Sequence, residues 1–480
     1  MRLTSRAFYF VGAIVLVFAV CEHLFFVDRG FYSIGWDESG RTLDAYTWAA
    51  HGIGASKAWL PFYRICVGLG LRAHPDLVVT PRIISFSFGL GSIVAAAWLA
   101  QELFQGRTTT LLTLTLGAFC SQRVALSLAP LSDIMFVFVM LVTMALLARW
   151  LRTDGRTALF ACALFAALAT TIRYEGWISA AAVAVIVAGR SRFASTAMKR
   201  KDLVAVGAIV FTFAAAWSVS TFPETNPIGA VIVDARRLSP AQILRKNPLV
   251  ELAVTNALSL NLIGIVAILH FTRRGPWRHR AIIAASFGPL LVASLVLLLT
   301  RSAQTGPSWR MIGVWTMLLL PFTAWVLAGG DRPAAEDGKG KALAIAATML
   351  VLAAFVFDTF RIERDSSWAF PESDRLAGRY LDGLLTAKPE ARVLIESSRY
   401  FFLNVQVASQ HPDAFVTNSV PERESTSLLP LGGRVRQALE GREIELLVFR
   451  TDEYRDFLNR SPEVTKLGDF GPWSIYAVRR

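Results

Sequence analysis

Two adjacent carboxylates that could do chemistry stand just past the first apolar stretch of the chain. Asp37 and Glu38 lie in the segment SIGWDESGRTLDAY, after an apolar run that begins near Phe8. A positioned carboxylate can remove a proton from a hydroxyl group. Adjacent acids are also common in solvated loops, so the pair can equally be a loop feature without a chemical role.

Further candidates share a position at the ends of later apolar runs: Arg123, Asp133, Arg173, Tyr174, Glu175 and Arg310. Arginine suits bidentate phosphate binding. A charge at membrane depth is costly unless it is paired or hydrated, so each is a candidate for a functional site. Plainer interpretations stay open. Arg173 and Glu175 can pair to close a hairpin. Asp133 can cap a helix, and Arg310 can be an interfacial anchor.

The composition indicates a protein with many membrane spans. The chain of 480 residues is 54% hydrophobic and 18% charged, and its mean hydropathy is +0.46, whereas soluble proteins carry about 25% charged residues. The net charge is +13, and most of the basic residues lie in short loops between apolar runs, which is the positive-inside pattern. We therefore expect membrane lipids as partners and no nucleic acid.

About eleven spans can be drawn, since roughly 20 apolar residues cross a membrane. They lie near residues 8–27, 79–104, 108–128, 131–150, 157–172, 174–189, 203–222, 249–271, 281–300, 311–329 and 342–358. The Lys and Arg residues of the shorter loops predict a cytoplasmic N-terminus, and an odd number of spans then puts the C-terminus outside. No signal-peptidase pattern follows the first run, so we expect an uncleaved first span.

The spans position the candidates in different ways. The runs near 157–172 and 174–189 have about 16 residues each, or roughly 24 Å of helix against a hydrocarbon core of about 30 Å. Their turn, which contains Arg173 and Glu175, is therefore expected below the outer surface, as the floor of a cavity. In the outer region 28–78, the segment AWLPFYRICVGLGL is too short to span and is expected to lie along the interface.

The tail predicts a small α/β domain outside the membrane. The tail is less hydrophobic than the rest of the chain. Its apolar patterns predict strands at ARVLIES, IELLVFR and GPWSIYAV, and helices at SDRLAGRYLDGLL and GRVRQALEG. The expected organisation is a transmembrane module over residues 1–358 and an extracytoplasmic domain over 359–480.

Together these segments resemble the GT-C superfamily of multi-spanning glycosyltransferases, which use polyprenyl-phosphate-linked sugars. They are most similar to bacterial relatives of protein O-mannosyltransferases and of the lipid A aminoarabinose transferase. The resemblance is carried by Asp37-Glu38, TPRIISFSFGLGSIVAAAWLAQELFQGR, SLAPLSDIMFVFVMLVTMALLARWLR, ALATTIRYEGW, SWRMIGVWTMLLLPFTAWVLAGG and the α/β tail. It covers nearly the whole chain.

The resemblance implies an all-α membrane bundle with the small α/β domain attached. It places the catalytic carboxylate on Asp37, with Glu38 beside it, and the lipid phosphate on Arg173 and Arg310. Many relatives read His-Arg-Tyr where this chain has Ser308-Trp309-Arg310. No Asp-x-Asp loop of the metal-dependent branch is found, so we expect no cofactor, although a divalent metal is compatible with the sequence.

The sequence thus predicts an inverting glycosyltransferase at the outer face of the inner (cytoplasmic) membrane. Asp37 would remove a proton from an acceptor hydroxyl on a protein, a lipid or a glycan, while arginines hold the departing phosphate. Arg123, Asp133, Tyr174 and Glu175 are grouped with the donor-binding residues. The alternatives are a transporter or flippase of a lipid-linked or anionic solute, and a non-catalytic membrane scaffold. Clustering of charge at one face argues against a transporter.

Overall fold

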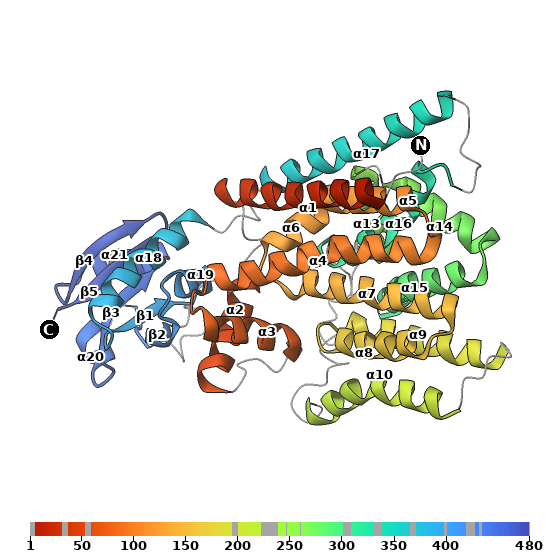
Figure 1. Ribbon diagram of the computed structural model, residues 1–480. Helices are drawn as coiled ribbons and strands as arrows, with labels where there is room; N and C mark the ends of the chain where they lie inside the picture. The colour runs from red at the N-terminus through yellow and green to blue at the C-terminus, as the bar shows by residue number, and fades with distance from the viewer. Residues whose placement is uncertain are drawn as a thin grey trace. The chain divides into compact units, whose positions relative to one another are not determined.

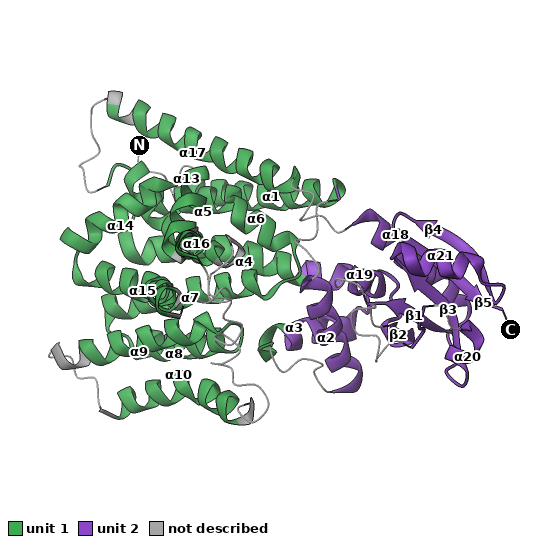
Figure 2. Cartoon of the chain, turned by 180° about the vertical axis from the view of Figure 1, so that it is seen from behind, with its two compact units in different colours: residues 1–29, 56–63, 84–365 green, residues 30–55, 64–83, 366–480 purple. Residues whose placement is uncertain are grey.

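The structure is a computed structural model. It describes residues 5–30, 37–52, 59–193, 200–221, 239–245, 247–259, 261–300, 309–330, 338–364, 371–397, 401–418, 428–431 and 434–479. The chain divides into two compact units (Figure 2). Unit 1 comprises residues 1–29, 56–63 and 84–365, and unit 2 comprises residues 30–55, 64–83 and 366–480.

Unit 1 is helical (Figure 1). Its helices are α1 (Ser5–Asp28), α4 (Val79–Phe104, whose first residues belong to unit 2), α5 (Arg107–Phe119), α6 (Ser121–Leu128), α7 (Ser132–Thr153), α8 (Arg156–Thr170), α9 (Glu175–Phe193), α10 (Arg200–Thr221), α12 (Pro240–Arg245), α13 (Pro248–Leu258), α14 (Leu262–Arg274), α15 (Trp277–Thr300), α16 (Trp309–Leu327) and α17 (Gly338–Arg364). Helix α7 is buried along almost its whole length and packs against α8, α15 and α16. It is the central helix of this unit.

The protein is a multi-pass membrane protein. Within the described residues, six helices are long and apolar enough to cross a membrane: α1, α4, α7, α10, α15 and α17. The pair α5 and α6, bent by 52°, makes a seventh if it is one span. Each expected span has a helical counterpart, but several of these are short or divided. The expected count of about eleven spans is therefore not confirmed.

One expected span, over residues 249–271, is divided into α13 and α14 by a polar break. The backbone N–H of Asn261 donates to the carbonyl of Asn256 at 2.7 Å, and the hydroxyl of Thr323 donates to Asn261 Oδ1 at 2.6 Å. Buried polar partners thus satisfy backbone and side-chain groups where the helix is interrupted. Irregular backbone is tolerated at membrane depth when protein surrounds it in this way.

Unit 2 is an α/β fold with two helices from the N-terminal part of the chain. These are α2 (Asp37–His51) and α3 (Pro61–Ala73, whose first residues belong to unit 1). The later elements are α18 (Glu372–Ala387), β1 (Arg392–Glu396), α19 (Phe401–Ala408), β2 (Phe415–Asn418), α20 (Val435–Leu439), β3 (Ile444–Phe449), α21 (Asp452–Arg460), β4 (Val464–Phe470) and β5 (Trp473–Val478). The sheet order is β2-β1-β3-β5-β4. Strand β1 runs parallel to β2 and β3, and β5 runs antiparallel to β3 and β4.

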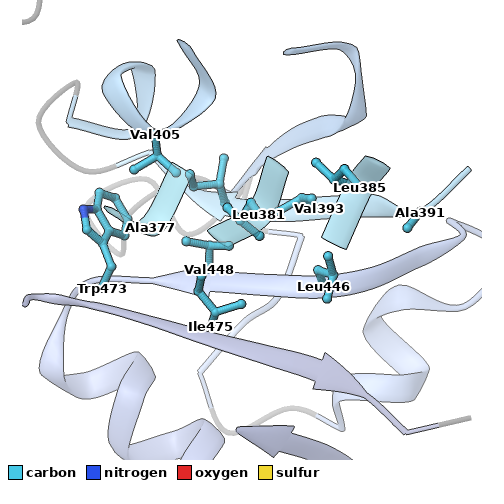
Figure 3. Close-up of a cluster of buried hydrophobic side chains, with 11 residues drawn as sticks. Ala377, Leu381, Leu385, Ala391, Val393, Val405, Leu446, Val448, Trp473 and Ile475 are labelled. Carbon is cyan, nitrogen blue, oxygen red and sulfur yellow. The ribbon is translucent and has the colours of Figure 1, made fainter. Parts of the chain in front are cut away.

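The sheet is covered on both faces because alternate residues of its central strands point to opposite sides. On one face, Ala377, Leu381 and Leu385 of α18 are directed toward the strands (Figure 3). On the other face, Leu394 and Leu447 pack with residues of α20 and α21. The central strands are therefore mostly apolar, which is why the sequence predicts them.

The expected elements of the tail are confirmed as α18, β1, α20, β3 and β5, whereas β2, β4, α19 and α21 were not expected. The last segment of unit 2 begins at residue 366, a few residues after the expected division at 358/359. Unit 2 also contains residues 30–55 and 64–83, which the sequence predicts as part of the transmembrane module. The physical reason is that α2 packs against α19.

Candidate functional site

The turn between α8 and α9 holds Arg173 in a tight bend of the chain. The backbone N–H groups of Ile172 and Arg173 both donate to the carbonyl of Ala169, at 3.2 and 3.3 Å. A Cβ atom on Gly176 would lie 2.3 Å from the same carbonyl oxygen. Only glycine permits this approach, so the segment RYEG closes the turn in a way that few other sequences allow.

Arg173 lies between two carboxylates of unit 1. Its Nη1 donates to Asp133 Oδ1 at 2.8 Å, and its Nη2 donates to Glu175 Oε1 at 2.9 Å. The Arg173 side chain is 9% exposed, and Asp133 at the start of α7 is buried. The hairpin-closing pair considered from the sequence is therefore present, and Asp133 joins it. One positive charge faces two negative charges, so the guanidinium is held in place from two sides.

Two further contacts join this turn to its surroundings. The Tyr63 hydroxyl, buried, donates to the carbonyl of Pro130 at 2.5 Å, next to the start of α7. The backbone N–H of Phe62 donates to the carbonyl of Thr171 at 3.1 Å. Residues 62–63 thus contact both turns that carry the Asp133–Arg173 pair. Sequence analysis missed Tyr63, and nothing in its local pattern marks it.

Tyr174 points to an aromatic neighbour. Its ring meets that of Trp177 edge to face, with centroids 5.3 Å apart, and Trp177 Nε1 donates to the carbonyl of Thr170 at 2.9 Å. The tryptophan thereby satisfies one of the last carbonyls of α8, which have no partner within the helix.

Arg123 has the contacts of a structural residue. Its side chain is fully buried and donates to Glu22 Oε2 at 2.8 Å. It also donates to the carbonyls of Gly117, at 3.2 Å, and Ala118. These carbonyls end α5, so the guanidinium satisfies the acceptors left open where α5 and α6 bend. A role in donor binding stays a prediction that these contacts do not favour.

Arg310 lies in the first turn of α16, and its side chain is outside the described part of the structure. Its predicted role with the lipid phosphate therefore stays a prediction.

The acidic pair begins a helix of unit 2. Asp37 and Glu38 form the first turn of α2, where the helix dipole favours negative charge. The Asp37 side chain is 40% exposed, and its Oδ2 lies 3.9 Å from Nε of Arg41. Glu38 is only 2% exposed. The two acids therefore differ in access to a ligand, as expected if they have different roles.

Helix α2 is held by contacts on both of its sides within unit 2. Asp44 pairs with Arg64 of α3 at 3.5 Å, and both side chains are buried. Ser39 donates to Asn404 Oδ1 of α19 at 2.7 Å. Tyr46 donates to Asp413 at 2.7 Å, and burial together with this hydrogen bond raises the pKa of Tyr46 to about 12.

The predicted residues thus fall into two groups. Asp133, Arg173, Tyr174 and Glu175 come together in unit 1, while Asp37 and Glu38 lie in unit 2. That the two groups share one site stays a prediction.

Within the described ranges, no group of three or more His, Cys, Asp or Glu side chains is placed to hold a metal ion.

No protein-family model and no curated protein matches this sequence. Solved structures do match. ArnT from Cupriavidus metallidurans in the apo state has a TM-score of 0.67 over 97% of both chains, at 14% identity. The same protein bound to undecaprenyl phosphate has a TM-score of 0.63, also at 14% identity and 97% of both chains.

A second group of matches comes from an archaeon. The apo oligosaccharyltransferase from Archaeoglobus fulgidus has a TM-score of 0.57 at 13% identity, over 93% of this chain and 70% of that one. At these identities the similarity concerns the fold. The chain has the fold of ArnT and of this oligosaccharyltransferase, and the resemblance inferred from the sequence is confirmed at the level of the fold.

Proposed function

We propose that the protein is a membrane glycosyltransferase that moves a sugar from a polyprenyl-phosphate donor to an acceptor hydroxyl. One observation carries the proposal: the fold is shared along 97% of both chains with ArnT, which has been solved bound to undecaprenyl phosphate. The Archaeoglobus fulgidus oligosaccharyltransferase AglB, solved with an inhibitory peptide and a dolichol-phosphate, has a similar fold. Function resides in sites rather than folds, so the site residues supply the tests.

In the proposed reaction Asp37 is the general base. Its carboxylate removes the proton from the acceptor hydroxyl as that oxygen attacks the anomeric carbon from the side opposite the phosphate. A new carbon–oxygen bond forms, the bond to the phosphate oxygen breaks, and the polyprenyl phosphate leaves with the electron pair. The configuration at the anomeric carbon is thereby inverted. The exposure of Asp37 and the burial of Glu38 support different roles for the two acids. In this proposal Glu38 orients the hydroxyl groups of the acceptor or the sugar.

Arg173 and Arg310 are proposed to stabilise the charge that develops on the phosphate. The paired carboxylates Asp133 and Glu175 fix the Arg173 guanidinium, which lowers the reorganisation needed during the reaction. We further propose that the reaction occurs at the outer face of the inner membrane, with the N-terminus in the cytoplasm.

The decisive experiment offers several polyprenyl-phosphate sugars to the purified full chain in lipid nanodiscs and follows transfer by mass spectrometry. Asp37→Asn is expected to lower turnover by about 10²–10⁴, the usual effect of losing a general base, without changing donor affinity. Glu38→Gln should have a smaller effect, mainly on binding. The matched control is Asp452→Asn, because Asp452 also lies in the first turn of a helix of unit 2 and is exposed.

Three outcomes would contradict the proposal or the assignment of Asp37 as its general base. Wild-type turnover in Asp37→Asn, on an identified substrate pair, would remove Asp37 from the chemistry. Movement of an intact donor across the bilayer without sugar transfer would identify a flippase. Consumption of no donor by the wild type would favour the scaffold.

A further inference from the structure

The first turn of α2 is tied to the α/β fold by a chain of buried hydrogen bonds. Ser39 Oγ donates to Asn404 Oδ1 at 2.7 Å. Asn404 Nδ2 donates to Asp374 Oδ2 at 2.9 Å, and Trp473 Nε1 donates to Asp374 Oδ1 at 2.7 Å. All four side chains are at most 3% exposed, so bulk water does not compete for these bonds.

This chain has a fixed direction. A carboxylate only accepts hydrogen bonds, so Asp374 requires the NH₂ group of Asn404 on its side. The amide oxygen of Asn404 must then face Ser39, whose hydroxyl donates to it. Burial raises the pKa of Asp374, and the hydrogen bonds from Asn404 and Trp473 oppose that rise. A buried polar chain with every group satisfied specifies one arrangement of the elements it joins.

The attachment is repeated further along α2. Tyr46 lies seven residues, or two helical turns, after Ser39, and so on the same side of the helix. Its hydroxyl bonds Asp413, which follows α19. Between the two attachments, Thr42 and Ala45 are buried. The bond of Ser39 is buried and that of Tyr46 is exposed, so the first contributes more to holding α2 and the second adds a restraint two turns away.

We propose that Asn404 is a positioning residue for sugar transfer, and that the α/β fold serves to hold the general base. Ser39 is two residues from Asp37 in the same turn, so the bond from Ser39 to Asn404 holds the helix backbone from which the Asp37 carboxylate extends. This inference rests on the proposed function of Asp37. A displacement of about 1 Å at a reacting group can lower a rate by about 10²-fold, so the positioning is of kinetic importance.

The test compares Asn404→Leu and Ser39→Ala with a matched control in the full chain. The control is Asn418→Leu, because Asn418 is fully buried in β2 and bonds Leu429 and Tyr454, which lie away from α2. Three quantities are measured for each variant: kcat and KM for the donor, the melting temperature, and the rate of amide hydrogen exchange over residues 37–51.

Asn404→Leu is expected to lower kcat by about 10- to 100-fold, to leave the donor KM within about twofold, and to speed exchange in α2. Ser39→Ala should lower kcat by about tenfold, the worth of one buried hydrogen bond. Because Asn404 acts through Ser39, the double variant should lose no more kcat than Asn404→Leu alone. Asn418→Leu should lower the melting temperature without changing kcat or exchange in α2.

Two results would overturn the inference: unchanged α2 exchange and kcat in Asn404→Leu, or fully additive losses in the double variant. Failure of the proposed function is recognised separately, since the wild type would then transfer no sugar. In that case exchange still decides whether Asn404 holds α2, because the measurement needs no substrate.

Discussion

Arg173 is paired with two carboxylates, and this decides what its removal does. Asp133 is buried beside the guanidinium, so removal of the arginine deprives a buried acid of this counter-charge. Breaking a buried pair in this way typically costs about 3–5 kcal/mol. On the proposed function, substitution of Arg173 changes both donor binding and stability, and an experiment must separate the two effects.

We expect Arg173→Ala to weaken donor binding by about one to two decades, the worth of a charge-assisted phosphate contact, and to lower the melting temperature. The double variant Arg173→Ala/Asp133→Asn removes the buried charge as well. It should regain much of the stability but none of the donor affinity, measured by titration with the donor lipid. Arg310→Ala should weaken donor binding similarly. Normal donor affinity in the double variant would assign Arg173 to structure.

Gly176 allows a test of the turn itself. A Cβ atom there would meet the Ala169 carbonyl, so Gly176→Ala should destabilise the protein by about 1–3 kcal/mol, the usual penalty of overpacking. Gly189→Ala on the same helix is the control, because a Cβ atom there meets nothing within 4 Å. Thermal unfolding in detergent measures both. Equal melting temperatures for the two variants would mean that the turn tolerates a larger distance between residue 176 and the Ala169 carbonyl.

At the level of elements, the bend between α5 and α6 depends on Arg123. Arg123→Met keeps much of the apolar stem but leaves the last carbonyls of α5 and the carboxylate of Glu22 without the guanidinium. We expect a large fall in melting temperature, with the donor affinity of the folded protein unchanged within about twofold. The Arg173→Ala/Asp133→Asn variant is expected to behave in the opposite way, with stability largely regained and donor affinity lost. A loss of donor affinity without loss of stability would instead support donor binding by Arg123.

The elements that the sequence predicted are those with strong apolar patterns. Strands β1, β3 and β5 are central, buried and apolar, whereas the missed strands β2 and β4 are the two edges of the sheet. Edge strands are kept short or charged, which limits edge-to-edge association: β2 has four residues and β4 reads VTKLGDF. The division of residues 249–271 was missed because its cause, Thr323 against Asn261, lies on another helix.

At the level of the whole molecule, residue types were predictable and their partners were not. The chemistry proposed for Asp37, Glu38 and Arg173 follows from their side chains and their positions at the ends of apolar runs. Their surroundings come from distant parts of the chain: Asn404 is 365 residues from Ser39, and Asp133 is 40 residues from Arg173. Such pairings depend on tertiary packing, which no local pattern encodes.

Topology is a prediction for the whole chain. A fluorescent reporter that matures only in the cytoplasm, fused after Arg480, should be silent if residues 359–480 lie outside. The same reporter fused after Thr153, at the end of α7, should be bright, because that loop is expected inside. Comparison of fluorescence at equal expression measures both. A bright signal after Arg480 would change the number of spans by at least one.

The composition of unit 2 from early and late segments also sets an order of events during synthesis. Ser39 leaves the ribosome 365 residues before Asn404, which at about 5–20 residues per second is a delay of roughly 20 to 70 seconds. During that time every helix from α4 to α17 is made, while α2 waits without its partner on α19. A nascent or interrupted chain can therefore carry the Arg173 turn and yet lack the bond from Ser39 to Asn404 that holds α2. On the proposed function, sugar transfer would begin only after translation has passed α19, so an unfinished chain would leave the lipid-linked sugar intact.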